Sequence, residues 1–277
     1  MVATERHPQQ SKTLRKLAGA QTLSGLGVTG TFAAGSLLVV QISGSEALAG
    51  LVQTSTVVGA ALLALPLANW TDKGGRRRSL GFGYFLGALG ATFAFLGGVN
   101  KIFPLILIGA AMIGGASAAG YQARFAAVDL ADNDHRASDL SKVVWASTVG
   151  SVLGPNLMEP AGEMALAFGL PKLVGPYIVA IVMLFSAATL ITLLLKPDPF
   201  LLAREERGEV YKREKRAFRK AFTTIRTIPQ AWLALHAIVI GHIAMVTIMV
   251  MTPVHMAHVD VSLRLIGLVI SVHVLGM

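Results

Sequence analysis

The stretch TDKGGRRRS, residues 71–79, decides how the chain is read. It packs five charges and two adjacent glycines between two long segments, 47–68 and 79–100, that carry no charge. Glycine allows backbone turns that other residues resist. Positive charge beside an apolar helix resists transfer across a membrane. The stretch therefore predicts a tight cytoplasmic turn between two membrane-spanning helices.

The composition agrees with a bilayer environment. Of the 277 residues, 53% are hydrophobic and only 14% are charged, whereas soluble domains carry about 25% charged residues. Lipid is thus the expected solvent of most of the chain. Cysteine is absent, which excludes disulfides, cysteine-ligated metals and a thiol nucleophile.

The apolar runs predict an all-α polytopic membrane protein. A helix needs about 20 apolar residues to cross a bilayer. Spans are predicted at 17–42, 47–69, 79–99, 102–123, 142–162, 173–195 and 231–256. An eighth span begins near 263 and stops at Met277.

Lysine and arginine predict the orientation. The N-terminal tail and the connections after the second, fourth and sixth spans hold all but three of the 24 basic residues, the exceptions being Lys101, Lys172 and Arg264. Because basic connections stay in the cytoplasm, we expect a multi-pass protein of the plasma membrane with its N-terminus and these connections inside the cell.

The sixth connection divides the chain into three parts. Residues 1–195 are expected to form a six-helix bundle, 196–230 a charged cytoplasmic linker, and 231–277 the start of a second bundle. Within the linker, residues 207–222 read as a basic amphipathic helix on the inner membrane surface. A solvated linker is the alternative. Anionic lipid explains its basic run better than nucleic acid, which is not expected as a partner.

Residues 68–78, ANWTDKGGRRR, resemble the loop between the second and third spans of major facilitator superfamily transporters. That loop reads G-x-x-x-D-(R/K)-x-G-R-(R/K). The matching residues are Asp72, Lys73, Gly75, Arg76 and Arg77, and Ala68 replaces the first glycine. The resemblance implies the N-terminal six-helix bundle of such a transporter, followed by one full and one truncated helix of a second bundle.

A second charged cluster, between the fourth and fifth spans, extends this resemblance. Asp129 and Arg136 match an acidic residue, six residues and an arginine that members of the family carry there. Arg124 needs a partner so near a span, either Asp129 or Asp72, unless it reaches the interface alone. The resemblance therefore implies a cytoplasmic gating network of Asp72, Lys73, Gly75, Arg76, Arg77, Arg124, Asp129 and Arg136. The plainer reading of the first cluster is a topology signal and a turn.

The fifth span carries GSVLGPN, residues 150–156. Gly150, Gly154 and Pro155 resemble the centre of a motif found in exporters of the family, although Met158 and Glu159 replace its later glycine pair. The match favours export. A small helix-packing face with a proline bend explains the same residues.

Polar residues inside the spans are the candidates for a substrate cavity: Gln21, Thr22, Gln53, Gln122 and Asn156. Such groups also tie helices together. Because no strong charge is placed at mid-depth in the first six spans, we expect an apolar or neutral solute.

No cofactor or metal is expected, and the protein is not expected to be an enzyme. GLGVTG, residues 25–30, fits G-x-G-x-x-G but lies within a span instead of after a strand. His255, His258 and Asp260 offer too few firm ligands for a metal.

The predicted function is secondary transport of small organic solutes by alternating access. The last 14 residues, from Arg264, make a helix of about 21 Å, short of the roughly 30 Å hydrocarbon core. We therefore expect a fragment that should not transport without its C-terminal half as a partner. A non-transporting sensor or partner subunit derived from the same fold is the alternative.

Overall fold

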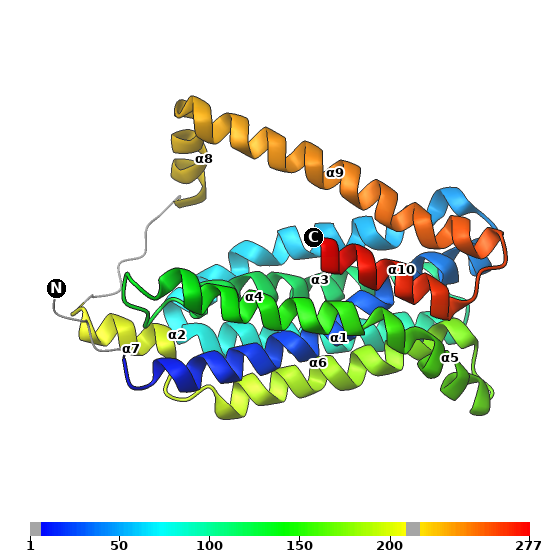
Figure 1. Ribbon diagram of the computed structural model, residues 1–277, viewed down its shortest axis with the longest axis horizontal. Helices are drawn as coiled ribbons and strands as arrows, with labels where there is room; N and C mark the ends of the chain where they lie inside the picture. The colour runs from blue at the N-terminus through cyan, green and yellow to red at the C-terminus, as the bar shows by residue number, and fades with distance from the viewer. Residues whose placement is uncertain (1–6, 209–216) are drawn as a thin grey trace.

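The computed structural model describes residues 7–208 and 217–277, and the regular elements in those ranges are all helices (Figure 1). The α-helices are α1 (Gln10–Ser43), α2 (Gly50–Val99), α3 (Phe103–Ala126), α4 (Arg136–Leu153), α5 (Met158–Ala167), α6 (Gly175–Leu194), α7 (Pro199–Glu206), α8 (Ala217–Thr227), α9 (Pro229–His258) and α10 (Leu263–Gly276). Single 3₁₀ turns, η1 (Glu46–Leu48), η2 (Pro155–Leu157) and η3 (Lys172–Val174), join some of them. The predicted all-α membrane fold is confirmed.

Five helical segments within the described residues are long and apolar enough to cross a bilayer, and they contain α1, α2, α3, α6 and α9. The 50-residue α2 holds both the second and the third predicted spans, because it breaks at Gly75 instead of ending there. The fifth predicted span is divided into α4, η2 and α5. Pro155 begins this interruption, since proline has no N–H to donate to the preceding turn.

Close backbone contacts hold the bundle together. The central helix, α1, packs against α3, α4 and α6, and 78% of its most apolar stretch is buried. A Cβ on Gly150 of α4 would collide with the backbone of Thr22 in α1, and one on Gly154 would collide with the Thr29 hydroxyl. Such contacts are expected of membrane helices, which gain little from hydrophobic burial against one another. Gly150 and Gly154 therefore lie at a helix contact.

The segment after the linker is only partly attached to the bundle. None of the most apolar stretch of α9 is buried, and the helix reaches the bundle only toward its C-terminal end (Figure 1). Residues 209–216 lie outside the described residues, so the predicted amphipathic helix is described only from Ala217, where α8 begins.

The last helix, α10, packs against α4, η2 and α5. Gly267 fits against the carbonyl group of Pro155. Asn156 Nδ2 donates to Ser271 Oγ at 2.7 Å. The small residues Gly267 and Ser271 therefore allow α10 to approach the bundle closely.

The connections rich in lysine and arginine gather at one end of the bundle, at the left of Figure 1. The start of α1, the break in α2, the α3–α4 connection and α7 all lie there. We call this the basic end. It carries most of the residues that the sequence marked for gating.

Candidate functional site

A carboxylate from a distant part of the chain holds the break in α2. The backbone N–H groups of Arg76 and Arg77 donate to Asp198 at 3.1 and 2.8 Å. Asp198 also accepts from the N–H groups of Phe200 and Leu201, at 3.1 and 3.3 Å, and so caps α7. One carboxylate thereby satisfies the first N–H groups of two helical segments, which have no partner within their own helix.

The break requires glycine at one position of the pair. Gly75 has φ 81° and ψ 173°, a conformation that strains any residue with a side chain. A Cβ at Gly75 would also lie 2.7 Å from Asp198 Oδ1. At Gly74 the nearest atom to an added Cβ is Arg78 Cδ at 3.1 Å, in a flexible side chain. The sequence motif therefore depends on Gly75 and not on Gly74.

Just past the break, the Arg76 guanidinium turns into the bundle. Its Nε and Nη2 donate to the two carboxylate oxygens of Asp129, at 2.8 and 3.1 Å. Nη1 donates to Gln122 Oε1 at 2.9 Å, and the guanidinium carbon lies 5.3 Å from the centre of the Phe200 ring. The paired side chains are only 10% and 12% exposed. Removing one partner would leave a poorly solvated charge, which costs more than breaking a surface pair.

The start of the sixth connection is fastened to the same site. Arg204 Nη1 donates to the carbonyl oxygen of Asp72 at 3.2 Å, and Arg207 Nη2 donates to that of Asp129 at 3.4 Å. From the sequence we predicted that residues 196–230 form one linker. The structure packs its first part, through Arg207, against the basic end.

Other members of the expected network stay apart. Asp72, Lys73 and Arg136 are exposed, and in residues 7–208 and 217–277 their side chains form no ion pair. Arg77 is half-buried and joins the site through its backbone N–H. The structure thus brings together Arg76, Asp129 and the backbone around Gly75, but not the side chains of Asp72 or Arg136.

Arg124 points elsewhere, and the expected contact with Asp129 or Asp72 is not formed. Asp129 is occupied by Arg76. The Arg124 guanidinium carbon lies 5.2 Å from the centre of the Tyr121 ring. Its Nε is buried, and no described residue accepts a hydrogen bond from it. Arg124 therefore carries a charge that the bundle itself leaves partly unsatisfied.

That charge borders a cavity of about 180 Å³ between α1, α3 and α4. The polar lining residues are Gln21, Ser24, Thr29, Ser117, Tyr121, Arg124, Ser147 and Ser151. The serines were missed by sequence reasoning. Their helical spacing, as in Ser147 and Ser151, was the available signal, since residues four apart share a helix face.

The polar residues that the sequence assigned to a substrate cavity are scattered. Only Gln21 lines this cavity, and its amide is engaged by the Tyr84 hydroxyl and the Gly120 carbonyl, at 3.1 and 3.0 Å. Thr22 donates to the Ala146 carbonyl at 3.0 Å and ties α1 to α4.

The other three candidates lie in three different places. Gln122 binds Arg76 and Asn156 binds Ser271. Gln53 lines a separate cavity of about 360 Å³ between α2 and α9, where its Oε1 is buried without a partner in the described chain. Most predicted cavity residues therefore join helices to one another.

Asp198 was also missed, although it is the centre of the site. Asp followed by Pro is a signal for a helix N-terminus, and it stands just before α7. Elsewhere, His258 contacts Glu46 at 2.8 Å, and the described residues contain no group of three His, Cys, Asp or Glu side chains that could hold a metal ion.

Comparisons with known proteins agree with this architecture. Residues 17–277 match the sequence profile of the Major Facilitator Superfamily. Two Bacillus subtilis (strain 168) proteins, the uncharacterized MFS-type transporters YdeG and YddS, are 32% and 31% identical to this chain. Each match covers 96% of this chain. The chain spans 63% and 61% of their lengths.

A solved structure has a similar fold. It is a bacterial homologue of the human lysosomal transporter Spinster, in an inward-facing and unoccupied conformation. The TM-score is 0.65 at 19% identity, and the match covers 95% of this chain and 59% of that one.

Proposed function

Because the chain belongs to the major facilitator superfamily, we propose that the full-length protein is a secondary transporter that exports small organic solutes across the plasma membrane by alternating access. The chain covers less than two thirds of its curated relatives, so the proposal concerns the whole protein. Its N-terminus and basic end face the cytoplasm in this proposal, as the distribution of lysine and arginine favours.

The cavity between α1, α3 and α4 carries the proposal. It places hydroxyl groups and one guanidinium inside a membrane-spanning bundle. Polar groups cost free energy in such surroundings unless something binds them. A polar solute would supply the missing contacts, above all to Arg124 Nε.

The cavity also changes the expected solute. The sequence argument for a neutral or apolar solute assumed that no charge lines the cavity, and Arg124 does line it. Polar and negatively charged solutes should therefore be tested first. Export, as opposed to uptake, is favoured by Gly150, Gly154 and Pro155, which resemble the exporter motif.

The test is solute export by the full-length protein in cells and in inside-out vesicles. Metabolite profiling of cells with and without the protein would identify solutes that leave the cell faster. Those solutes should accumulate in inside-out vesicles under an ion gradient. Solute binding without flux would contradict transport and favour the sensor.

A pair of matched variants connects transport to the cavity. Ser147→Leu fills the cavity, whereas Ser186→Leu makes the same change on the exposed face of α6. We expect the first to abolish export at normal expression and the second to leave it intact. Equal export by both would show that the cavity is not the transport site.

A further inference from the structure

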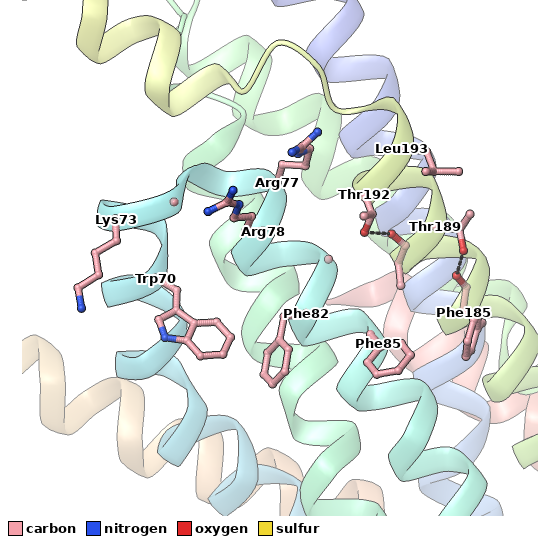
Figure 2. Close-up of a pocket in the computed structure, with 13 residues that line it drawn as sticks. Trp70, Lys73, Arg77, Arg78, Phe82, Phe85, Phe185, Thr189, Thr192 and Leu193 are labelled. Carbon is pink, nitrogen blue, oxygen red and sulfur yellow. Dashed lines mark hydrogen bonds between the residues drawn. The ribbon is translucent and has the colours of Figure 1, made fainter.

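A second hollow lies on the outer surface of the bundle, next to the basic end. This groove, of about 890 Å³, runs between α6 and the part of α2 that follows Gly75, with Trp70 on one side (Figure 2). It does not share a lining residue with the cavity between α1, α3 and α4. It is therefore a separate site, open toward the surroundings of the bundle.

Aromatic rings form the walls of the groove. Trp70 and Phe82 meet edge to face with their ring centres 4.6 Å apart, and Phe85 and Phe185 do so at 5.6 Å. All four side chains are between 37% and 48% exposed. Because α2 and α6 lie in the membrane, lipid chains are the medium that these rings face.

Basic side chains form one end of the groove. Lys73, Arg77 and Arg78 line it (Figure 2), and none of them forms an ion pair within residues 7–208 and 217–277. No acidic residue lines the groove in that part of the chain. Arg76 is the exception in the run, since it turns inward to Asp129. The groove thus carries positive charge that the protein does not neutralise.

The charged end and the apolar walls are within reach of one molecule. Arg78 and Phe85 are seven residues apart on one helix, about 10 Å along its axis. Between these levels, Thr189 and Thr192 donate their hydroxyl hydrogens to carbonyls of their own helix, at 2.9 and 2.6 Å (Figure 2). The middle of the groove therefore suits an apolar chain.

We propose that this groove binds an anionic phospholipid of the adjacent leaflet, with its phosphate against Arg77 and Arg78 and an acyl chain along Phe82, Phe85 and Phe185. The occupant must reach the groove from within the membrane and must be negative at one end only. A phospholipid with an anionic headgroup meets both conditions. An apolar helix would cover the rings but leave both arginines without a counter-charge.

Photo-crosslinking tests the proposal on the chain as it stands. A benzophenone amino acid replaces Phe185 in the groove or, as a control, Phe93 on the same bundle, which is 38% exposed but does not line the groove. Both proteins are reconstituted in equal parts of phosphatidylglycerol and phosphatidylcholine with identical acyl chains. Mass spectrometry identifies the adducts. The quantity compared is the ratio of phosphatidylglycerol adducts to phosphatidylcholine adducts. We expect this adduct ratio to be about five or greater at Phe185 and near one at Phe93.

Charge variants supply the second readout. Arg77→Gln with Arg78→Gln should bring the ratio at Phe185 close to one. Lys12→Gln with Arg15→Gln removes the same charge from exposed positions of α1 and should leave the enrichment intact. A ratio near one at Phe185 in the unchanged protein, enrichment that survives loss of both arginines, or an adduct with a second copy of the chain would each overturn the proposal.

Discussion

Three consecutive arginines end in different surroundings. Arg76 is 8% exposed and bound to Asp129, whereas Arg77 is half-buried and Arg78 is exposed at the groove. The break at Gly75 causes this division. It starts a new helical segment whose first side chain faces the bundle, and each following residue is rotated by about 100°. One arginine of a basic run can therefore form a buried ion pair while its neighbours stay exposed.

The glycine pair allows a matched test of the break. Gly75→Ala should lower the free energy of unfolding by at least about 2 kcal/mol, because its φ is positive and its Cβ would meet Asp198. Gly74→Ala should be neutral or stabilising, since alanine favours a helix. Tryptophan fluorescence during unfolding in mixed detergent micelles measures both. Equal losses would mean that Gly75 does not hold the break.

The Arg76–Asp129 pair should show strong coupling in a double-mutant cycle. Arg76→Ala or Asp129→Ala leaves a mostly buried charge without its partner, which costs about 3 kcal/mol or more. The double variant should lose less than the sum, by about 1–3 kcal/mol. Lys172 and Glu163, with side chains 33% and 58% exposed, provide the control and should couple by less than about 1 kcal/mol. Similar coupling in both pairs would contradict the role of burial.

At the scale of elements, the interrupted fifth span contacts both α1 and α10, the first and last helices of the chain. Its glycines pack against α1, and η2 packs against α10. The interruption at Pro155 leaves a backbone carbonyl against which Gly267 fits. A proline that shortens a helix thus also provides a contact surface for the segment beyond the linker.

A large side chain should be tolerated less well at the α1–α4 contact, where Gly150 lies, than at an open position of α9. Gly150→Leu should prevent close packing of α4 on α1 and destabilise the bundle by several kcal/mol, or abolish folding. Gly241→Leu introduces the same side chain in α9, where an added Cβ meets no atom within 4 Å, and should be tolerated. Size-exclusion profiles and thermal unfolding of the purified variants measure the difference. A folded, fully stable Gly150→Leu protein would contradict the contact.

At the scale of the whole molecule, the two ends hold charge differently. At the opposite end, Lys172 lies 2.5 Å from Glu163 and 3.7 Å from Glu159. At the basic end, the side chains of Lys73, Arg77 and Arg78 form no ion pair with a described carboxylate. Uncompensated positive charge therefore accumulates on one side of the bundle, as expected for the cytoplasmic side.

Single cysteines test this orientation on a background that has none. Asn100→Cys should react with an impermeant maleimide on intact cells. Lys73→Cys should react only after permeabilisation. Both positions are exposed in the structure, so access depends on the side of the membrane. Labelling of Lys73→Cys but not Asn100→Cys on intact cells would show that the predicted orientation is wrong.

Hydropathy and the loop resemblance were sufficient for the fold, because spans of apolar residues and basic turns report the bilayer directly. They were insufficient for the site. The proline after Asp198 marks it as a cap of α7, but no residue pattern shows that it also binds the distant N–H groups of Arg76 and Arg77. The placement of Arg124 beside Ser147 requires knowing which helix faces meet. Polar residues such as Thr22 and Asn156 were assigned to a cavity because sequence does not distinguish a ligand contact from a helix contact.

The hydrogen bonds to Asp198 also impose an order on biosynthesis. Asp129 is synthesised 53 residues after Arg76, and Asp198 follows Arg76 by 122 residues. While the early helices enter the translocon, the N–H groups at the α2 break must remain bound to water or to transient partners. The turn between the second and third spans thus reaches its final state only after Asp198, which follows the sixth span, has emerged from the ribosome. Nascent chains arrested before that point would carry an open, protease-sensitive turn.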